Sequence, residues 1–424
     1  MLQSGDGIEL RAQCNATLVL KNKPHLWSPQ KPSLYGVVAW LSSGDSVIDV
    51  VRSYTGLRTV SIDRTAADNI ARIALNGKRL FMAGLLDQGY WPEGIYTAPS
   101  DGAMAADIRR AKALGFNLLR KHAKVEPARW YYHADRLGML VWQDMPSPPA
   151  ITCSSFADGD PNWKRHNDTR SEDESTEAWS RCPLDHNAFS RELREMLKSL
   201  ASFPSVVLWV LFNEGWGQHA TRTHVQTIRA LGGTRLLTDA SGWMLSAGNT
   251  ASSNRSALPS SASWLEGAST LAGACPPNAP CGDVIDVHAY PGPYPRKQHM
   301  RRWYGSGVWE RLQWGRSPHR ASVLGEFGGI RFELRGHTLS PYGWGYGAND
   351  AKTCEEYARH AVELWRQVGN IQGLAAAVYT QLTDVESEWN GLMTYDRVLK
   401  CGHEVRDRVV PAIVDVRTRL SALE

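Results

Sequence analysis

From residue 73 onward, short apolar runs alternate with longer stretches in which apolar residues recur at helical spacing. The clearest run, Val206–Phe212, is apolar throughout and rich in β-branched residues, as in a strand buried on both faces of a parallel sheet. The other expected strands are 81–86, 116–122, 138–144, 235–239, 284–290, 321–327 and 373–381. The expected helices are 100–114, 126–137, 188–201, 218–231, 351–368 and 404–420. Eight strands alternating with helices predict a (β/α)8 barrel, the TIM barrel of the α/β class.

The first 62 residues show a different pattern, in which short alternating runs are separated by turns rich in Pro, Gly and Ser. The expected strands are 8–12, 17–20, 34–40, 46–51 and 58–62. They predict a thin β-sandwich at residues 1–65, ahead of the barrel at residues 66–424. Because the first run begins close to Met1, we expect the start of this domain to be missing from the sequence.

Two segments, residues 151–185 and 246–283, have neither a helical nor a strand period and are rich in small and polar residues. We expect both to be surface insertions on the side where the barrel strands end. Each holds two cysteines, which would form a disulfide in an oxidising compartment and stay free thiols in a reducing one. These cysteines are Cys153 with Cys182 and Cys275 with Cys281. The compartment stays open: the first ten residues hold no apolar signal core, but a fragment would lack any earlier export signal.

Charge and composition narrow the choice of partners. A net charge of +4, with 21% charged residues scattered along the chain, argues against binding nucleic acid or a membrane surface. No apolar run approaches the roughly 18 residues that a membrane-spanning helix needs. The 17 Trp outnumber the 8 Phe, and indole rings suit the apolar faces of sugars, although most of these Trp are expected in the core. The oligomeric state stays open.

Polar residues end the expected barrel strands, which is where this fold carries its chemistry. Glu214 closely follows Val206–Phe212, and Glu326 lies at the end of the seventh strand. A polar turn is the simpler explanation for one glutamate, but so many polar strand ends on one rim favour an active site. The polar strand ends are Asp87, Arg120, His122, Asp144, Glu214, Asp239, His288, Tyr290, Glu326 and Gln381.

Glu214 and Glu326 are expected to face each other across the barrel mouth, because they end the fourth and seventh strands. Glycosidic cleavage needs two carboxyl groups beside the sugar, one protonated to donate to the leaving oxygen and the other ionised. A separation of about 5–5.5 Å predicts retention of the anomeric configuration, whereas about 6.5–9.5 Å admits a water molecule and predicts inversion.

A series of motifs between about residues 27 and 397 resembles glycoside hydrolase family 2, the family of β-galactosidases, β-glucuronidases and β-mannosidases. The motifs are Trp27–Tyr35, Tyr54–Arg58, Gly115–His122, Asn213–Gln218, Asp286–Pro293, Gly325–Gly329 and Thr380–Arg397. The resemblance implies that the N-terminal strands are a partial immunoglobulin-like β-sandwich ahead of a catalytic barrel.

The resemblance also implies roles for individual residues. Glu214 would be the acid/base and Glu326 the nucleophile, with Asn213 hydrogen-bonded to the sugar 2-hydroxyl and Tyr290 orienting the nucleophile. For the remaining substrate-binding candidates, a rim hydrogen bond or core packing is an equally good explanation. These candidates are His288, His122, Arg120, Asp87, Trp344 and Trp389. The implied partner is a carbohydrate substrate, with no cofactor and no metal.

Two departures from the family pattern affect the expected activity. The family's N-terminal jelly-roll domain is absent from this sequence, which leaves open whether the chain as given is active. β-Glucuronidases carry Asn-x-Lys before the glycine of the eighth-strand motif, whereas this chain has Glu388, Trp389 and Asn390 there. A glucuronide carboxylate would face Glu388, so we disfavour that substrate.

The favoured function is therefore a retaining β-glycosidase, β-galactosidase-like, with another exo-β-glycosidase such as a β-mannosidase as the alternative. A metal-dependent barrel hydrolase would want a His-x-His pair with further ligands, and His288 and Tyr290 do not supply that pair. A truncated, inactive carbohydrate-binding remnant is a third possibility. The presence of both glutamates argues against lost chemistry but not against a lost pocket.

Overall fold

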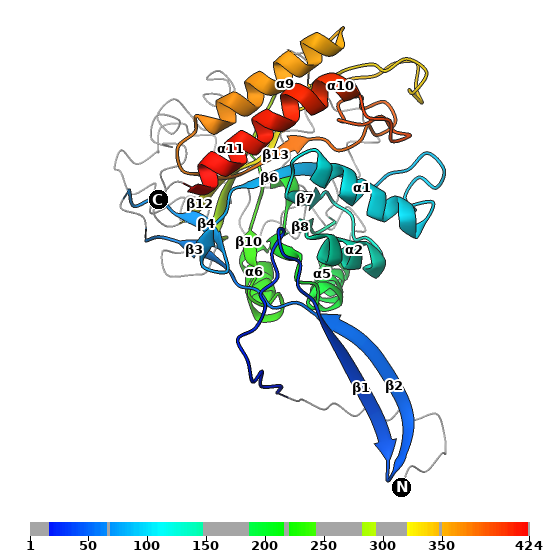
Figure 1. The fold of residues 1–424 in the computed structure, drawn as a ribbon, viewed down its shortest axis with the longest axis vertical. Coiled ribbons are helices and arrows are strands. Elements are labelled where there is room, and N and C mark those ends of the chain that lie inside the picture. The colour runs from blue at the N-terminus through cyan, green and yellow to red at the C-terminus, as the bar shows by residue number, and fades with distance from the viewer. Residues whose placement is uncertain are drawn as a thin grey trace.

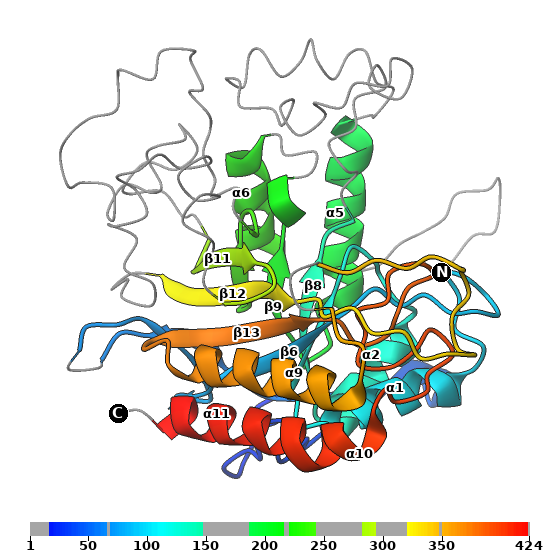
Figure 2. The same ribbon diagram turned by 90° about the horizontal axis from the view of Figure 1, so that it is seen from above.

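The computed structural model describes residues 17–65, 68–146, 186–215, 220–242, 282–293, 320–346 and 350–422. At its centre is a sheet of eight parallel strands (Figures 1 and 2). They are β6 (Met82–Asp87), β7 (Leu118–Lys121), β8 (Leu140–Asp144), β9 (Val206–Val210), β10 (Leu236–Thr238), β11 (Val284–Ala289), β12 (Ala321–Gly328) and β13 (Leu374–Thr380). The first of them, β6, pairs with both β7 and the last strand, β13, so the sheet curls into a nearly closed barrel that ends at β10 and β11. The predicted (β/α)8 barrel is confirmed.

The barrel helices lie outside the strands. They are α1 (Asp101–Ala113), α2 (Ala128–Leu137), α5 (His186–Leu200), α6 (Thr221–Leu231), α9 (Cys354–Gly369) and α11 (Val410–Ala422). A short α10 (Gly402–Glu404) and a π-helical turn, Val405–Val409, lead into α11, which lies beside α9 (Figure 2). Ser100 caps α1 by accepting a hydrogen bond from the Ala103 amide. Helix α2 begins two residues later than expected, because Pro127 takes an extended conformation at its N-cap.

The apolar runs of the strands are buried on both faces. Side chains such as Val207 and Val210 point into the barrel, where they pack with Trp142 and Val323. Trp209 of the same strand belongs to the second cluster, which fills the space between strands and helices. This two-sided burial is the physical reason why the barrel strands read as continuous apolar runs rather than as alternating ones.

The N-terminal region begins with an antiparallel hairpin of β1 (Tyr35–Ser43) and β2 (Ser46–Thr55), which extends away from the barrel (Figure 1). The next strand, β3 (Val60–Asp63), pairs instead with β4 (Arg72–Leu75), and β4 pairs with β5 (Lys78–Arg79). The β1–β2 hairpin is the described part of the immunoglobulin-like region. The division between this region and the barrel at residues 65 and 66 stays a prediction.

Two of the five expected N-terminal strands need separate comment. Residues 8–12 lie outside the described residues. The strand expected at residues 17–20 is wrong, because in the described structure this segment belongs to no strand, and Leu18 and Val19 are exposed. Alternation of apolar residues predicts a strand only where a neighbouring strand can complete the hydrogen bonds, and sequence does not reveal that neighbour.

Asp135 of α2 attaches the N-terminal segment to the barrel. Its backbone carbonyl accepts a 2.7 Å hydrogen bond from the Trp27 indole, and its carboxylate accepts one of 2.7 Å from the Tyr54 hydroxyl. The same carboxylate accepts a 2.8 Å hydrogen bond from the Ser205 amide, next to β9. Burial raises the pKa of Asp135 to about 6, against the hydrogen bonds from Ser205 and Tyr54.

A disulfide joins Cys354, at the start of α9, to Cys401, just before α10. Sequence reasoning did not propose this pair, and the four cysteines that it did consider lie outside the described residues. Of the two expected insertions, only Gly282 and Asp283 are described. Across the described ranges, the helices include none that is long and apolar enough to cross a membrane.

Candidate active site

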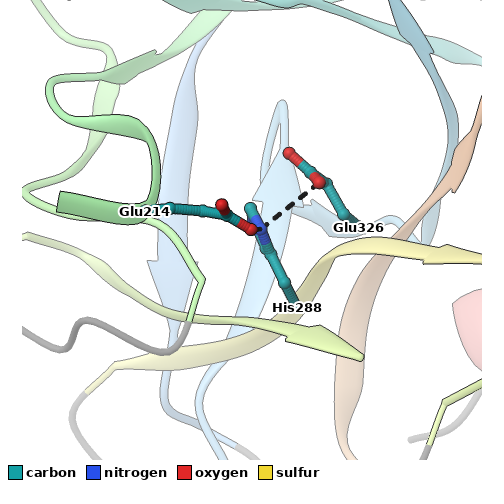
Figure 3. Close-up of side chains that lie close together, drawn as sticks. All are labelled: Glu214, His288 and Glu326. Carbon is teal, nitrogen blue, oxygen red and sulfur yellow. Dashed lines mark hydrogen bonds and ion pairs between the residues drawn. The ribbon is translucent and has the colours of Figure 1, made fainter. Parts of the chain in front are cut away.

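Glu214 and Glu326 lie beside each other at the end of the barrel where the strands terminate. Glu214 belongs to the turn Asn213–Gly215 after β9, with a left-handed backbone (φ 48°), and Glu326 lies near the end of β12. One carboxylate oxygen of Glu214 lies within 4.8 Å of one of Glu326, and both point toward His288 (Figure 3). Glu326 is buried and the Glu214 side chain is 21% exposed, so Glu214 is the more accessible of the two.

His288, on β11, bridges the two carboxylates. Its Nδ1 lies 2.9 Å from Glu214 Oε1 and 3.4 Å from Glu326 Oε2. Its Nε2 lies 3.2 Å from Nη1 of Arg120, which can only donate, so Nε2 accepts and the ring proton is on Nδ1. Burial lowers the pKa of His288 to about 3, although the charge of Glu326 opposes the shift. His288 is therefore a neutral imidazole that donates from Nδ1.

The three side chains would also suit a metal ion by residue type, since their ligand atoms lie within 4.8 Å of one another. A metal needs a lone pair on the imidazole nitrogen that binds it. Here Arg120 occupies Nε2, so Nδ1 carries the proton. The donor set therefore fits a pair of carboxylates bridged by a donor better than it fits a metal centre.

Arg120, on β7, is fully buried and forms hydrogen bonds with several side chains of the site. Its Nε and Nη2 donate to the two oxygens of Asp144 at 3.1 and 3.0 Å, and Nη1 donates to Glu326 Oε1 at 3.2 Å. Two carboxylates thus compensate the charge of one guanidinium, which would be costly to bury without a partner. Arg120 reaches the pocket through the groups that it holds rather than through an exposed surface of its own.

The Asn213 side chain is oriented by its neighbours. Its Oδ1 accepts hydrogen bonds from Arg120 Nη2 at 2.7 Å and from the Ser241 hydroxyl at 3.0 Å. Because both bonds use the oxygen, the amide orientation is fixed and the Nδ2 hydrogens remain to act as donors. Ser241, buried after β10, was not anticipated, although its place just beyond a strand end is the signal that identified the other site residues.

Tyr290 donates a 2.7 Å hydrogen bond to Glu326 Oε2, and its hydroxyl is also 2.7 Å from Thr380 Oγ1. Burial and the charge of Glu326 raise its pKa, so the phenol keeps its proton for this bond. Its ring stacks on Tyr346, with centroids 3.7 Å apart and planes 10° from parallel. Thr380 and Tyr346 were also missed, since neither interrupts an apolar strand with a charge.

His122 and Asp87 occupy different environments. His122 Nδ1 lies 2.9 Å from Asp144 Oδ2, and although burial lowers its pKa, the bond and charge of Asp144 win and raise it. Asp87 accepts from Lys121 Nζ at 3.0 Å and from the Gly89 amide at 3.0 Å, which links β6 to β7. The structure brings His122 to the Arg120–Asp144 network, whereas the bonds of Asp87 are made within its own pair of strands.

The two Trp candidates differ in exposure. Trp344 is 47% exposed and meets Tyr346 edge to face, with centroids 5.6 Å apart. Trp389 is 3% exposed, lies beneath the Arg331 guanidinium at 5.5 Å and packs against Gly343. Only Trp344 presents a broad open ring beside the aromatic stack that leads to Glu326.

A further carboxyl group, Asp286, lies behind the site on β11 and is buried. Burial raises its pKa to about 8; the charge of Glu326 adds to the shift and the charge of Arg120 opposes it. Its side chain packs on the backbone of Gly325, where a Cβ would collide with the carboxyl group. Burial thus favours the neutral acid of Asp286, and the residue before Glu326 has to be glycine.

Comparison with known proteins identifies the family. The family model for "Glycosyl hydrolases family 2, TIM barrel domain" matches residues 68–410, and that for "Glycosyl hydrolases family 2" matches residues 5–58. A β-galactosidase of Psychromonas ingrahamii is 28% identical over 198 residues, which are 46% of this chain and 16% of that protein. A mannosylglycoprotein endo-β-mannosidase of Lilium longiflorum is 28% identical over 204 residues, 45% of this chain and 18% of that protein.

Among solved structures, a β-galacturonidase from Eisenbergiella tayi bound to galacturonate superposes with a TM-score of 0.59 at 17% identity. It covers 92% of this chain, which spans 59% of its length. At this identity the likeness concerns the fold alone. The family models together extend from the N-terminal region through the whole barrel, and on that basis the chain belongs to glycosyl hydrolases family 2.

Proposed function

We propose that the chain is a retaining β-glycosidase in which Glu326 is the nucleophile and Glu214 the acid/base. The observation that supports this most is the approach of their carboxylate oxygens to within 4.8 Å. Inversion needs a gap of about 6.5–9.5 Å for a water molecule between carboxylate and sugar, whereas retention needs about 5–5.5 Å.

In the first step a Glu326 oxygen attacks the anomeric carbon while the glycosidic bond breaks, and the leaving oxygen takes the proton of Glu214. In the second step Glu214 removes a proton from water, which attacks the same carbon and releases Glu326 from the ester. The oxocarbenium-like transition state carries positive charge that the ionised Glu326 stabilises. Tyr290, at 2.7 Å, and Arg120, at 3.2 Å, fix the two Glu326 oxygens for this attack.

Asn213 is suited to the sugar 2-hydroxyl, because its oxygen is engaged and its amide hydrogens remain. We assign Arg120, His288 and Tyr290 to positioning the carboxylates, and Trp344 to contact with a sugar ring. Trp389 and Asp87 are better explained by packing and by strand pairing, given their burial and their bonds.

For the substrate, a β-galactoside is our first proposal, because a β-galactosidase is among the relatives in sequence. The alternative is a β-mannoside, since an endo-β-mannosidase matches equally well. Each relative is aligned over less than a fifth of its length, so these names supply hypotheses and the substrate has to be measured.

The test is a panel of 4-nitrophenyl β-glycosides, assayed with the wild type, Glu214→Gln and Glu326→Gln. We expect turnover of one neutral glycoside, loss of turnover in both variants, and a first-formed product whose anomeric configuration, followed by NMR, is that of the substrate. Activity that survives both substitutions would mean that other residues act. Inactivity of the folded wild type on every glycoside would favour the carbohydrate-binding remnant, and loss of activity with a chelator would favour the metal-dependent hydrolase.

A further inference from the structure

A third carboxylate, Glu388, lies in the segment between β13 and α10, inside a ring of amide side chains. Its Oε1 accepts a 3.0 Å hydrogen bond from Asn390 Nδ2, and its Oε2 accepts one of 3.0 Å from Gln88 Nε2. Gln381 closes the ring, because it donates to Asn390 Oδ1 at 2.8 Å and accepts from Gln88 Nε2 at 2.9 Å. Residues from the ends of β6 and β13 thus hold one carboxylate in a defined orientation.

The amide ring orients Glu388 but does not neutralise it. In the parts of the chain that the structure describes, no lysine, arginine or histidine forms an ion pair with this side chain. A carboxylate offers about four acceptor positions, and the two amides use one on each oxygen. Burial raises the pKa of Glu388, with the amide bonds opposing the shift. A partly buried anion with unused acceptor positions is costly unless a ligand completes it.

Hydrogen bonds link the surroundings of Glu388 to the site of Glu214 and Glu326. Gln381 directly follows Thr380, whose hydroxyl lies 2.7 Å from the Tyr290 phenol, and that phenol donates to Glu326. On its other side, the backbone beside Glu388 is bonded to Trp344 in both directions, at 2.9 Å each.

The electrostatics of Tyr346 agree with this placement. Burial raises the pKa of Tyr346, and the charges of Glu326, Glu388 and Glu214 add to the shift in that order. One phenol therefore lies within the field of all three carboxylates. Trp344, Tyr346 and Tyr290 form a chain of aromatic contacts from the segment of Glu388 to Glu326.

We propose that Glu388 is a specificity-determining residue that accepts hydrogen bonds from two hydroxyl groups of a neutral sugar and excludes uronic acids. The proposal rests on the proposed function for its sugar-binding pocket. Hydroxyl groups are donors and match the unused acceptor positions, whereas a sugar carboxylate brings no donor and a second negative charge. The three amide side chains hold Glu388 so that it cannot turn away from such a charge.

The first test compares each neutral 4-nitrophenyl glycoside with its uronic acid counterpart, galactoside with galacturonide and glucoside with glucuronide. We expect the ratio of kcat/KM values, neutral over uronide, to fall about tenfold or more in Glu388→Gln. Gln keeps the side-chain shape while removing the charge. Glu386→Gln, an exposed glutamate of the same segment, is the matched control and should leave the ratio unchanged. An unchanged ratio in Glu388→Gln would overturn the proposal.

The second test does not require turnover. Calorimetric titration of the folded wild type with galactose, glucose, mannose and their uronic acids should show binding of a neutral sugar and weaker binding of its acid. Glu388→Gln should reduce the ratio of the two dissociation constants, acid over neutral sugar, about tenfold. If this pattern holds while no glycoside is hydrolysed, the proposed function fails and the role of Glu388 stands. Binding of none of the six sugars, or equal preference in both proteins, overturns the role of Glu388.

Discussion

His288 Nδ1 lies 2.9 Å from Glu214 Oε1, and this hydrogen bond crosses from β11 to the turn after β9. The bond is one-directional, because Arg120 faces the other ring nitrogen at 3.2 Å and leaves the proton on Nδ1. A neutral donor that is buried with the acid/base stabilises the ionised form of that carboxyl without adding a charge. The acid strength of Glu214 thus depends on His288, and Arg120 determines which nitrogen of His288 carries the proton.

Replacing His288 by Phe keeps a flat ring but removes the donor. Glu214 should then hold its proton to higher pH, so the alkaline limb of the kcat/KM profile shifts upward, by roughly half a pH unit to one unit. We expect kcat/KM at the optimum to fall about 10- to 100-fold, as for a lost hydrogen bond to a charged group. His288→Asn, which restores an N–H donor, is the comparison. A Phe variant with reduced rate and an unmoved profile would assign His288 a packing role only.

Gly242 tests the same contact from the opposite side. Its φ is +78°, and a Cβ placed there would lie 3.0 Å from His288 Nδ1 and 3.1 Å from Glu214 Cγ. Gly242→Ala should push the two groups apart and lower kcat about tenfold or more, with a stability loss of roughly 1 kcal/mol from the left-handed backbone. Gly336→Ala has a similar positive φ with nothing near its Cβ, so it separates the backbone effect from the contact. Equal kcat values in the two variants would contradict the prediction.

The sequence predicts the barrel well, because two-sided burial leaves a direct trace in runs such as Val206–Phe212. Glu214 and Glu326 were identifiable for the same reason, since a carboxylate near the end of a buried apolar run contrasts with the residues before it. The rule that strand ends converge on one rim then places them in one pocket, and the structure has their oxygens within 4.8 Å.

What the sequence could not supply are relationships in which both partners look ordinary. Ser241 and Thr380 are small hydroxyl residues whose roles arise from Asn213 and Tyr290, far away in the chain. The same limit applies to Trp344 and Trp389, which are equivalent candidates by residue type. Only the packing of Gly343 against Trp389 separates the buried ring from the exposed one.

The roles of the two glutamates can be separated by leaving-group dependence. Glu214→Ala removes the proton donor, so hydrolysis of a 4-nitrophenyl glycoside, whose leaving group needs little protonation, should be affected less than that of a methyl glycoside. Azide should accelerate Glu214→Ala by attacking the glycosyl-enzyme, giving a β-glycosyl azide. In Glu326→Ala, azide should replace the nucleophile and give the α-azide. Product NMR distinguishes the two, and exchanged products would reverse the assigned roles.

The Cys354–Cys401 disulfide should stabilise the catalytic barrel. The two cysteines are 47 residues apart, and closing such a loop in the unfolded chain corresponds to about 4 kcal/mol in the chain-entropy view. Replacing both by Ser should lower the midpoint of urea unfolding, and a reducing agent should do the same to the wild type. The double variant serves as the control, because any response that it shows to the reductant comes from the remaining cysteines, Cys153, Cys182, Cys275 and Cys281 among them, and is subtracted from that of the wild type. Identical unfolding of oxidised and reduced wild type would show that the bond adds no stability.

Asp286 gives a pH dependence whose sign follows from its burial. In the folded protein its pKa is raised to about 8, whereas in the unfolded chain it is about 3.9. The stability that it contributes is therefore fully present below about pH 4 and is lost as the pH rises toward 8. Asp286→Asn mimics the neutral acid. Across that window, its free energy of unfolding relative to the wild type should rise by on the order of 1.4 kcal/mol per pH unit.

Urea unfolding of both proteins at several pH values measures this difference directly, because the other titrating groups cancel. Among them His288 acts in the opposite sense: its pKa is lowered to about 3 in the folded state, so its contribution falls as the pH falls below about 6.5. The exposed Asp49, changed to Asn, is the control for loss of a carboxylate at the surface. Parallel stability curves for wild type and Asp286→Asn would mean that Asp286 is ionised in the folded protein, and Arg120 would then be compensating a third buried carboxylate.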